Sequence, residues 1–304
     1  MVAVRAEGIK KTFTTGKSVV TALENISFNV EKGELFGVIG PDGAGKTTLF
    51  RILTTLMLAN EGSAEVDRLD VVKDFKSIRK HVGYMPGRFS LYQDLTVEEN
   101  LSFFATLFNT SIEANYDLVK DIYAHIEPFK KRKAGALSGG MKQKLALSCA
   151  LIHRPSILFL DEPTTGVDAV SRQEFWELLR NLQKQNITIV VSTPYMDEAS
   201  LCNRVALLQE GKILDIDSPR GIIKKFRKPL WAIRSKEMFR LMTDLKKMNE
   251  VESCFPFGQE HHVIVKEIND IKLVEKSLLT LNHSELNIKQ IEATIEDSFM
   301  ELMK

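Results

Sequence analysis

The sequence is poor in cysteine and has no long apolar run. Its three cysteines, Cys149, Cys202 and Cys254, lie far apart and lack Cys-x-x-Cys spacing. This pattern argues against a disulfide framework and a zinc site, and it predicts reduced, mostly buried thiols. The longest apolar stretches, such as 157–160 and 187–191, are far too short to cross a bilayer, and no basic segment followed by an apolar run stands at the N-terminus. We therefore expect any membrane association to depend on a partner.

The sequence also lacks an excess of charge of either sign. Its 41 basic and 40 acidic residues give a net charge of +1, so bulk electrostatics attracts neither nucleic acid nor anionic lipid. A local basic run, Lys130-Lys131-Arg132-Lys133, is interpreted as solvated surface, and no nucleic-acid partner is expected. With 44% hydrophobic and 27% charged residues, the chain of 304 residues has an ordinary globular composition, and its length suggests about two domains.

One glycine-rich stretch organises the rest of the chain. It fits the phosphate-loop pattern G-x-x-x-x-G-K-[ST] and reads Gly40, Pro41, Asp42, Gly43, Ala44, Gly45, Lys46, Thr47, Thr48. Residues 34–39 before it predict a buried strand, and the apolar spacing of residues 46–57 predicts a helix. Backbone N–H groups at such a helix start bind polyphosphate. We expect Lys46 to reach the β and γ phosphates and Thr47 to offer its hydroxyl to Mg²⁺. The alternative is a glycine-rich turn before a core helix.

A second strand predicts the acidic part of the same site. Residues 157–160 are continuously apolar and end in Asp161 and Glu162. Because adjacent strand residues point to opposite sides, we expect the two carboxylates to have different roles. Asp161 would hold Mg²⁺ through a water molecule, and Glu162 would orient or deprotonate the attacking water.

Two further features have both a binding and a structural interpretation. Ser138-Gly139-Gly140 precedes an apolar helix and predicts a second anion-binding helix start, although a serine N-cap with flexible glycines is the favoured interpretation of this segment taken by itself. Phe13 lies upstream of the phosphate loop, where its ring could stack on adenine, and a core phenylalanine in a strand is the alternative.

The element pattern predicts an α/β fold, in which a phosphate-loop core of mostly parallel sheet with an antiparallel β layer carries a helical insert. We assign the core to residues 1–226, the helical subdomain to about 88–152, and a small α+β accessory domain to 229–304. Short strands are expected over 2–30, joined at 14–18, with a helix over 68–82 and a chain reversal or hinge at 83–88. His261 and His262 are adjacent, make a poor metal pair and are expected at the surface.

These motifs, in their order and spacing, resemble the nucleotide-binding subunits of ATP-binding cassette (ABC) transporters. The matching residues are Gly40 to Thr48, Leu137-Ser138-Gly139-Gly140-Met141, residues 157–162 and Gly166-Val167-Asp168. The match covers residues 2–225, and the tail resembles the C-terminal domain of multidrug, antibiotic and lipid exporter subunits.

The resemblance implies an ATPase that works as half of a pair. Two such domains stack head to tail, and each ATP with its Mg²⁺ lies between the phosphate loop of one and the Ser138-Gly139-Gly140 segment of the other. Closure of the pair would drive a separate transmembrane permease docked near residues 89–95, where Phe89 and Tyr92 would be exposed. The chain would then be cytoplasmic and peripheral on the inner face of the cell membrane, and the membrane subunit would choose the transported substrate.

Two positions depart from the family. After Tyr84-Met85-Pro86 the family has Gln, whereas this chain has Gly87, and after Ser192-Thr193 it has His, whereas this chain has Pro194. Neither replacement carries a polar side chain. We therefore expect the chain's own site to bind MgATP but hydrolyse it poorly, with a different partner cassette supplying the competent site. A heterodimer is favoured and a homodimer is the alternative.

Two other functions remain as alternatives. A regulatory cassette subunit with little hydrolysis of its own would also fit the Gly87 and Pro194 replacements. A soluble non-transport ABC ATPase of DNA repair or translation fits less well, because the chain has one phosphate loop and no sustained heptads.

Overall fold

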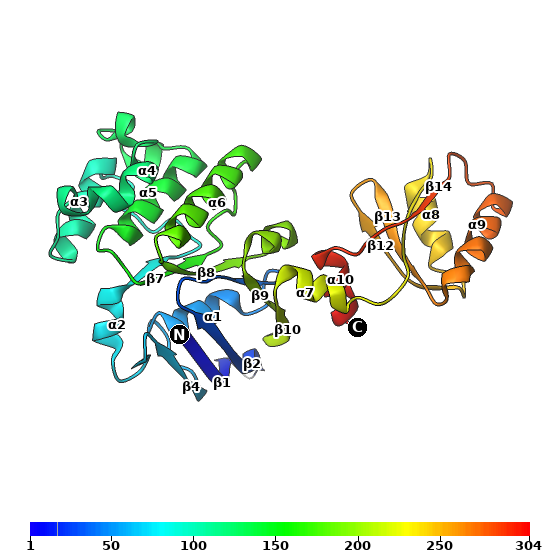
Figure 1. The fold of residues 1–304 in the computed structure, drawn as a ribbon, viewed down its shortest axis with the longest axis horizontal. Coiled ribbons are helices and arrows are strands. Elements are labelled where there is room, and N and C mark those ends of the chain that lie inside the picture. Colours follow the sequence, from blue (N-terminus) through cyan, green and yellow to red (C-terminus); the bar gives the residue numbers. More distant parts are fainter. Residues whose placement is uncertain (17) are drawn as a thin grey trace. The chain divides into compact units, whose positions relative to one another are not determined.

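The computed structural model describes residues 1–16 and 18–304, and the side chain of residue 15 is left out of the description. The chain divides into two compact units, Met1–Pro219 and Arg220–Lys304 (Figure 1). The division falls at the start of α7 (Pro219–Lys225), earlier than the expected boundary after residue 226. Each unit is described by itself.

A mixed sheet forms the centre of the first unit. Its strands run in the order β10-β9-β3-β8-β7-β6, with β10 antiparallel to β9 and the remaining neighbours parallel. The bounds are β3 Leu35–Ile39, β6 Val82–Met85, β7 Ile157–Asp161, β8 Thr188–Thr193, β9 Arg204–Gln209 and β10 Lys212–Asp217. Every residue of β3, β7 and β8 is buried, as expected for strands covered on both faces. The carboxyl ends of β3, β7 and β8 therefore meet at one edge of the sheet.

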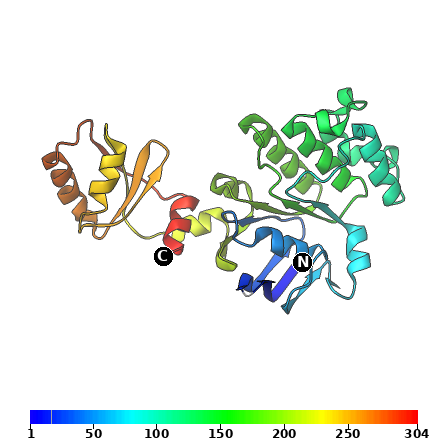
Figure 2. The ribbon, with the colours of Figure 1, turned by 180° about the vertical axis from the view of Figure 1, so that it is seen from behind.

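An antiparallel sheet forms a second layer of this unit. Its order is β2-β1-β4-β5, with β1 Val2–Thr15, β2 Ser18–Glu31, β4 Glu61–Val66 and β5 Leu69–Asp70. The helix α1 (Lys46–Leu53) lies between the two sheets (Figures 1 and 2), and its buried face joins both in one apolar core. The short strands expected over 2–30 are thus two long paired strands, and the predicted turn at 14–18 includes Lys17, which lies outside the described residues.

The helices α5 (Gly139–Leu151) and α6 (Ala169–Lys184) lie on the face of the mixed sheet opposite α1 (Figure 1). The helices α3 (Val97–Leu107) and α4 (Tyr116–Tyr123) pack on α5. Thr96 caps α3, because its side chain accepts from the Glu99 N–H while the Glu99 carboxylate accepts from the Thr96 N–H. The predicted capping box is therefore present at the start of the helical insert.

Two local predictions between the sheets and the insert are only partly right. The helix expected over 68–82 is shortened to α2 (Phe75–His81), because β5 occupies its start. The expected hinge at 83–88 begins instead with strand β6. Gly83 serves close packing there, since a Cβ at Gly83 would lie 2.5 Å from the Ala150 carbonyl oxygen of α5.

The second unit is a split β-α-β arrangement. In chain order it contains β11 Leu230–Arg234, α8 Met238–Leu245, β12 Val251–Phe257, β13 Glu260–Val265, α9 Ile271–Thr280 and β14 Asn287–Gln290. The sheet order is β12-β13-β11-β14, with all neighbours antiparallel, which is the ferredoxin-like topology. The helices α8 and α9 pack on one face of this sheet and build its apolar core.

The helix α10 (Ile295–Leu302), which the sequence pattern did not predict, contacts strand β13 of that sheet. Its Asp297 Oδ1 lies 2.6 Å from His262 Nδ1 of β13, and both side chains are buried. His261 is buried as well, with Nε2 2.8 Å from the Met238 carbonyl oxygen. The expectation of surface histidines is therefore wrong, because each imidazole has a polar partner inside the domain.

Candidate functional site

The phosphate loop joins β3 to α1 as its sequence predicts. The N-cap of α1 is Gly45 at φ 107°, and within the described residues no side chain caps this helix start and its first turn holds no acid. Uncapped N–H groups and the positive end of the helix dipole favour an anion. The loop is therefore suited to hold phosphate at its backbone.

The glycines of the loop have different structural reasons. A Cβ at Gly40 would lie 2.1 Å from the Leu208 carbonyl oxygen of β9, and one at Gly45 would lie 2.5 Å from the Ala22 carbonyl oxygen of β2. These two glycines let the loop pack against both sheets. Gly43, at φ 80°, would place its Cβ in open space, so it supplies the left-handed backbone on the open side of the loop.

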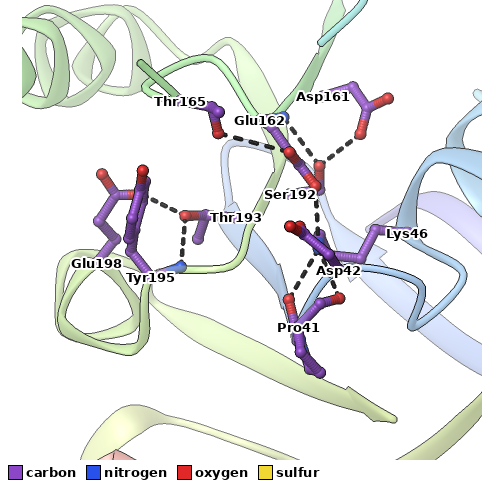
Figure 3. Close-up of polar contacts among 11 residues, drawn as sticks. Pro41, Asp42, Lys46, Asp161, Glu162, Thr165, Ser192, Thr193, Tyr195 and Glu198 are labelled. Carbon is purple, nitrogen blue, oxygen red and sulfur yellow. Dashed lines mark hydrogen bonds and ion pairs between the residues drawn. The ribbon is translucent and has the colours of Figure 1, made fainter. Parts of the chain in front are cut away.

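The side chain of Lys46 folds back over the phosphate loop (Figure 3). Its Nζ donates to the carbonyl oxygens of Gly40 at 2.8 Å and Pro41 at 2.9 Å, and it lies 3.0 Å from Glu162 Oε1. Asp42 Oδ1 is 4.0 Å away, and the lysine side chain is only 3% exposed. A buried ammonium is held by its partners, so its charge is fixed in position beside the loop.

Asp161 and Thr47 lie together at the carboxyl end of β7. Asp161 is 1% exposed and accepts hydrogen bonds from the Ser192 hydroxyl, at 2.7 Å, and from the Thr47 hydroxyl. Burial raises the pKa of Asp161 above its usual value, and these two hydrogen bonds oppose the rise. In the described part of the chain no group of three or more His, Cys, Asp or Glu side chains could hold a metal. A hard cation at Thr47 and Asp161 would need oxygens from phosphate or water as well, which suits Mg²⁺.

Glu162 adopts a backbone conformation that the strand pattern did not predict. It follows β7 at φ 50°, in the left-handed region, so the expected alternation of Asp161 and Glu162 along a strand is wrong. Its Oε1 contacts Lys46, and its Oε2 accepts from the Thr165 hydroxyl at 3.5 Å. Both carboxylates are therefore close to the phosphate loop.

The two replaced positions lie against this site. A Cβ at Gly87 would lie 3.0 Å from the Asp161 carbonyl oxygen and 3.7 Å from Glu162 Cβ, so the backbone approaches the acidic residues closely. Pro194 directly follows Thr193, whose carbonyl oxygen accepts from the Gly40 N–H at 3.2 Å. Neither residue brings a polar side chain to the site.

Ser138 and its two glycines start α5. Ser138 is the N-cap, and its Oγ accepts from the Met141 N–H at 3.4 Å. Ser138 and Gly139 are exposed, while a Cβ at Gly140 would lie 2.7 Å from Ser171 Oγ of α6. Ser138 is therefore an N-cap, as one interpretation predicted. Anion binding by the exposed Ser138 and Gly139 stays a prediction.

Phe13 is not a core residue. It pairs with Val20 in the β1–β2 ladder, its side chain is 37% exposed, and Lys11 Nζ lies 5.4 Å from the ring centroid. The core alternative is therefore wrong, and stacking on a base stays a prediction.

The structure also shows a buried carboxylate that sequence reasoning missed. Glu198 is 2% exposed and accepts from the Thr164 hydroxyl at 2.8 Å. It also accepts from the Thr193 hydroxyl at 2.5 Å (Figure 3). It thereby joins the segment after β7 to the end of β8. The surrounding polar segment, Met196–Leu201, looks like surface in the sequence, so composition carried no signal for this link.

Fold and site together define a phosphate-loop nucleotide-binding protein. The profile of the ABC transporter family matches residues 23–165. The Nod factor export ATP-binding protein I of Rhizobium sp. (strain N33) is 37% identical over 227 residues, which are 74% of this chain and 73% of that protein. The chain belongs to the ABC transporter family.

Other relatives extend or shorten this match. The probable multidrug ABC transporter ATP-binding protein YbhF of Escherichia coli (strain K12) is 35% identical over 290 residues, 93% of this chain. The doxorubicin resistance ATP-binding protein DrrA of Mycobacterium tuberculosis (strain ATCC 25618 / H37Rv) is 36% identical over 218 residues, 70% of this chain. The chain spans 49% of the length of YbhF and 64% of that of DrrA.

Solved structures share the fold of the first unit. A dimeric post-hydrolysis state of the ATP-binding cassette MJ0796, bound to ADP and Pi, is 26% identical with a TM-score of 0.65. The similarity covers 71% of this chain and 98% of that one. In the described residues, no helix combines the length and apolarity needed to span a bilayer.

Proposed function

We propose that the chain is the ATP-binding subunit of an ABC exporter, which pairs with a second cassette and drives a separate membrane subunit. The observation that carries this proposal is the uncapped start of α1 with the buried Lys46 ammonium held beside it. Backbone N–H groups and a fixed positive charge together suit the β and γ phosphates of ATP. The names of YbhF, DrrA and the Nod factor protein support a role in export.

Each residue of the site has a role in this proposal. Thr47 and Asp161 hold Mg²⁺, which neutralises charge on the phosphates when it is bound. Lys46 binds the β and γ phosphates. The phosphate then replaces Glu162 as the partner of the Lys46 ammonium, so the Glu162 carboxylate is released. Glu162 then accepts the proton of the attacking water or orients it. Phe13, exposed on β1, stacks on the adenine ring.

The second cassette completes the site. Ser138 and Gly139 are exposed at the start of α5, where they can bind the γ phosphate held by the phosphate loop of the partner. The dimeric form of MJ0796 bound to ADP and Pi supports such a pair. We favour a heterodimer, with a homodimer as the alternative.

A membrane subunit has a candidate docking site within the first unit. A cavity of about 260 Å³ is lined mainly by apolar and aromatic side chains of β6, α3, α5 and the segment between them, among them Phe89, Leu91, Phe104 and Phe108. Tyr92 beside it is 51% exposed. We propose that a short apolar segment of the permease fills this cavity, which would hold the chain at the cytoplasmic face of the membrane.

The chain's own site is proposed to turn over slowly. Gly87 and Pro194 remove two polar side chains that the family places near the attacking water and the γ phosphate, and loss of one such donor commonly costs about 10²–10³ in rate. Ser138, Gly139 and Gly140 are intact, so they complete the competent site of a different partner. A second candidate, a regulatory subunit with almost no turnover, rests on the same two replacements.

ATP turnover of the purified chain tests this proposal. We expect slow turnover by the unmodified chain and faster turnover by Gly87→Gln combined with Pro194→His. Because a Cβ at position 87 would meet the Asp161 carbonyl oxygen at 3.0 Å, Gly87→Ala is the matched control for the steric cost of that close approach. Family-typical turnover by the unmodified chain would contradict the slow-site proposal. Turnover that stays near zero with the intact partner cassette present would favour the regulatory subunit.

A further inference from the structure

A single buried hydroxyl contacts both acidic residues of the site. Ser192 lies one residue before the end of β8, is 0% exposed, and is the direct neighbour of Asp161 in the β7–β8 ladder. Its Oγ donates to Asp161 Oδ1 at 2.7 Å and accepts from the Glu162 N–H at 3.0 Å (Figure 3). Both hydrogen-bonding functions of the hydroxyl are therefore used on the candidate catalytic strand.

The contact to Glu162 stabilises a strained backbone. Glu162 is at φ 50°, in the left-handed region that non-glycine residues rarely adopt because it is strained. Its N–H is shared between the carbonyl oxygen of Ser192, at 3.1 Å, and the hydroxyl of the same residue. The turn that results directs the Glu162 carboxylate to Lys46, at 3.0 Å. Ser192 thus acts on the direction of Glu162 without touching its side chain.

The contact to Asp161 fixes a buried carboxylate. Asp161 is 1% exposed, so its oxygens depend on protein donors, and the donors are the hydroxyls of Ser192 and Thr47. The Ser192 bond occupies Oδ1 from the β8 side and restricts rotation of the carboxylate. The geometry of Asp161 toward Thr47 is therefore set by Ser192.

We infer that Ser192 is a positioning residue for nucleotide binding with Mg²⁺, acting through Asp161 and Glu162. The inference rests on the proposed function, because it assigns Ser192 to the same ATP site. A buried serine can also satisfy its hydroxyl locally, by bonding to the carbonyl oxygen four residues earlier in its own helix. Ser148 of α5 does so, since it is also 0% exposed and its Oγ donates to the Lys144 carbonyl oxygen at 2.9 Å.

The experiment compares Ser192→Ala with the matched control Ser148→Ala. The affinity of the full chain for a fluorescent ATP analogue is measured once with Mg²⁺ and once with EDTA, and thermal melting is recorded for each variant. Removing one hydrogen bond to a charged group should weaken binding with Mg²⁺ by about tenfold in Ser192→Ala. Binding with EDTA should stay within about twofold of the unmodified chain, because the phosphate loop is unchanged. Ser148→Ala should alter neither affinity.

The conservative variant Ser192→Thr keeps the hydroxyl and should restore the difference between Mg²⁺ and EDTA. Equal weakening of Ser192→Ala in both conditions, or a loss matched by Ser148→Ala, would overturn the positioning role while the unmodified chain still binds ATP. Failure of the unmodified chain to bind the analogue in either condition would instead overturn the proposed function.

Discussion

The contact between Asp297 and His262 gives a stability prediction for the second unit. Asp297 is 0% exposed, and its Oδ1 lies 2.6 Å from His262 Nδ1. Its Oδ2 accepts from the N–H and the hydroxyl of Thr294, both at 2.7 Å, and so completes the capping box of α10. Asp297→Ala removes the hydrogen bonds from Thr294 to the Asp297 carboxylate and the contact of α10 with His262 of β13, while Thr294 stays as the N-cap.

The expected loss follows from these two contacts. Loss of the hydrogen bonds from Thr294 to the Asp297 carboxylate costs about 1 kcal/mol, and leaving the buried imidazole of His262 without its partner costs about 1–3 kcal/mol. The free energy of unfolding of the second unit should therefore fall by roughly 2–4 kcal/mol. A change of 1 kcal/mol shifts the melting temperature of a domain of this size by about 4–8 °C, so the shift should be roughly 8–30 °C.

Differential scanning calorimetry of the full chain measures this shift. Asp297→Asn keeps an acceptor for Thr294 and should lose less than Asp297→Ala. Glu275→Ala removes an exposed carboxylate of α9 and is the matched control, with no expected shift. If Asp297→Ala and Glu275→Ala had the same melting temperature, the buried contact would contribute nothing to stability and the reasoning would be refuted.

Three further predictions concern single residues. Lys46→Ala removes the fixed positive charge of the loop and should weaken ATP binding by at least about tenfold in an equilibrium titration; unchanged affinity would contradict its role. Gly40→Ala places a Cβ 2.1 Å from the Leu208 carbonyl oxygen and should cost roughly 1–3 kcal/mol in urea unfolding, whereas an unaltered midpoint would mean that the loop relaxes freely. The hydrogen bond from Lys228 lowers the pKa of Glu252 below its ordinary value of 4.5, so this pair stabilises the fold above that pH and its contribution is lost as the pH falls through the lowered pKa. Melting temperatures of the unmodified chain and Lys228→Met should therefore differ at pH 7 and converge as the pH falls below the lowered pKa of Glu252, and a constant difference would exclude this explanation.

The parts of the fold that are local in sequence were predictable. The phosphate loop, the apolar strand before Asp161 and the capping box of Thr96 each depend on residues within a few positions of one another. Such patterns specify an element without knowledge of its neighbours. These local patterns were enough to predict the fold class and the site residues at the carboxyl edge of the mixed sheet.

The parts that depend on distant neighbours were not predictable. Gly83 looks like a turn residue until the backbone of α5 is seen beside it, and His262 looks like surface until α10 covers it. The left-handed conformation of Glu162 depends on two oxygens of Ser192 that accept from the Glu162 N–H, and Ser192 lies thirty residues further along the chain. A pattern read in one strand carries no information about the strand that pairs with it.

The burial of all three cysteines has a practical consequence for testing the proposed pair of cassettes. Cys149, Cys202 and Cys254 are free and buried, and burial raises the pKa of each thiol, that of Cys254 to about 11. Slow-reacting native thiols leave the surface open to site-directed labelling. A short bifunctional maleimide could therefore join a cysteine introduced at Ser138 of one cassette to a cysteine introduced at Asp42 of the other. The cross-linked product would show that the start of α5 in one cassette faces the phosphate loop of its partner.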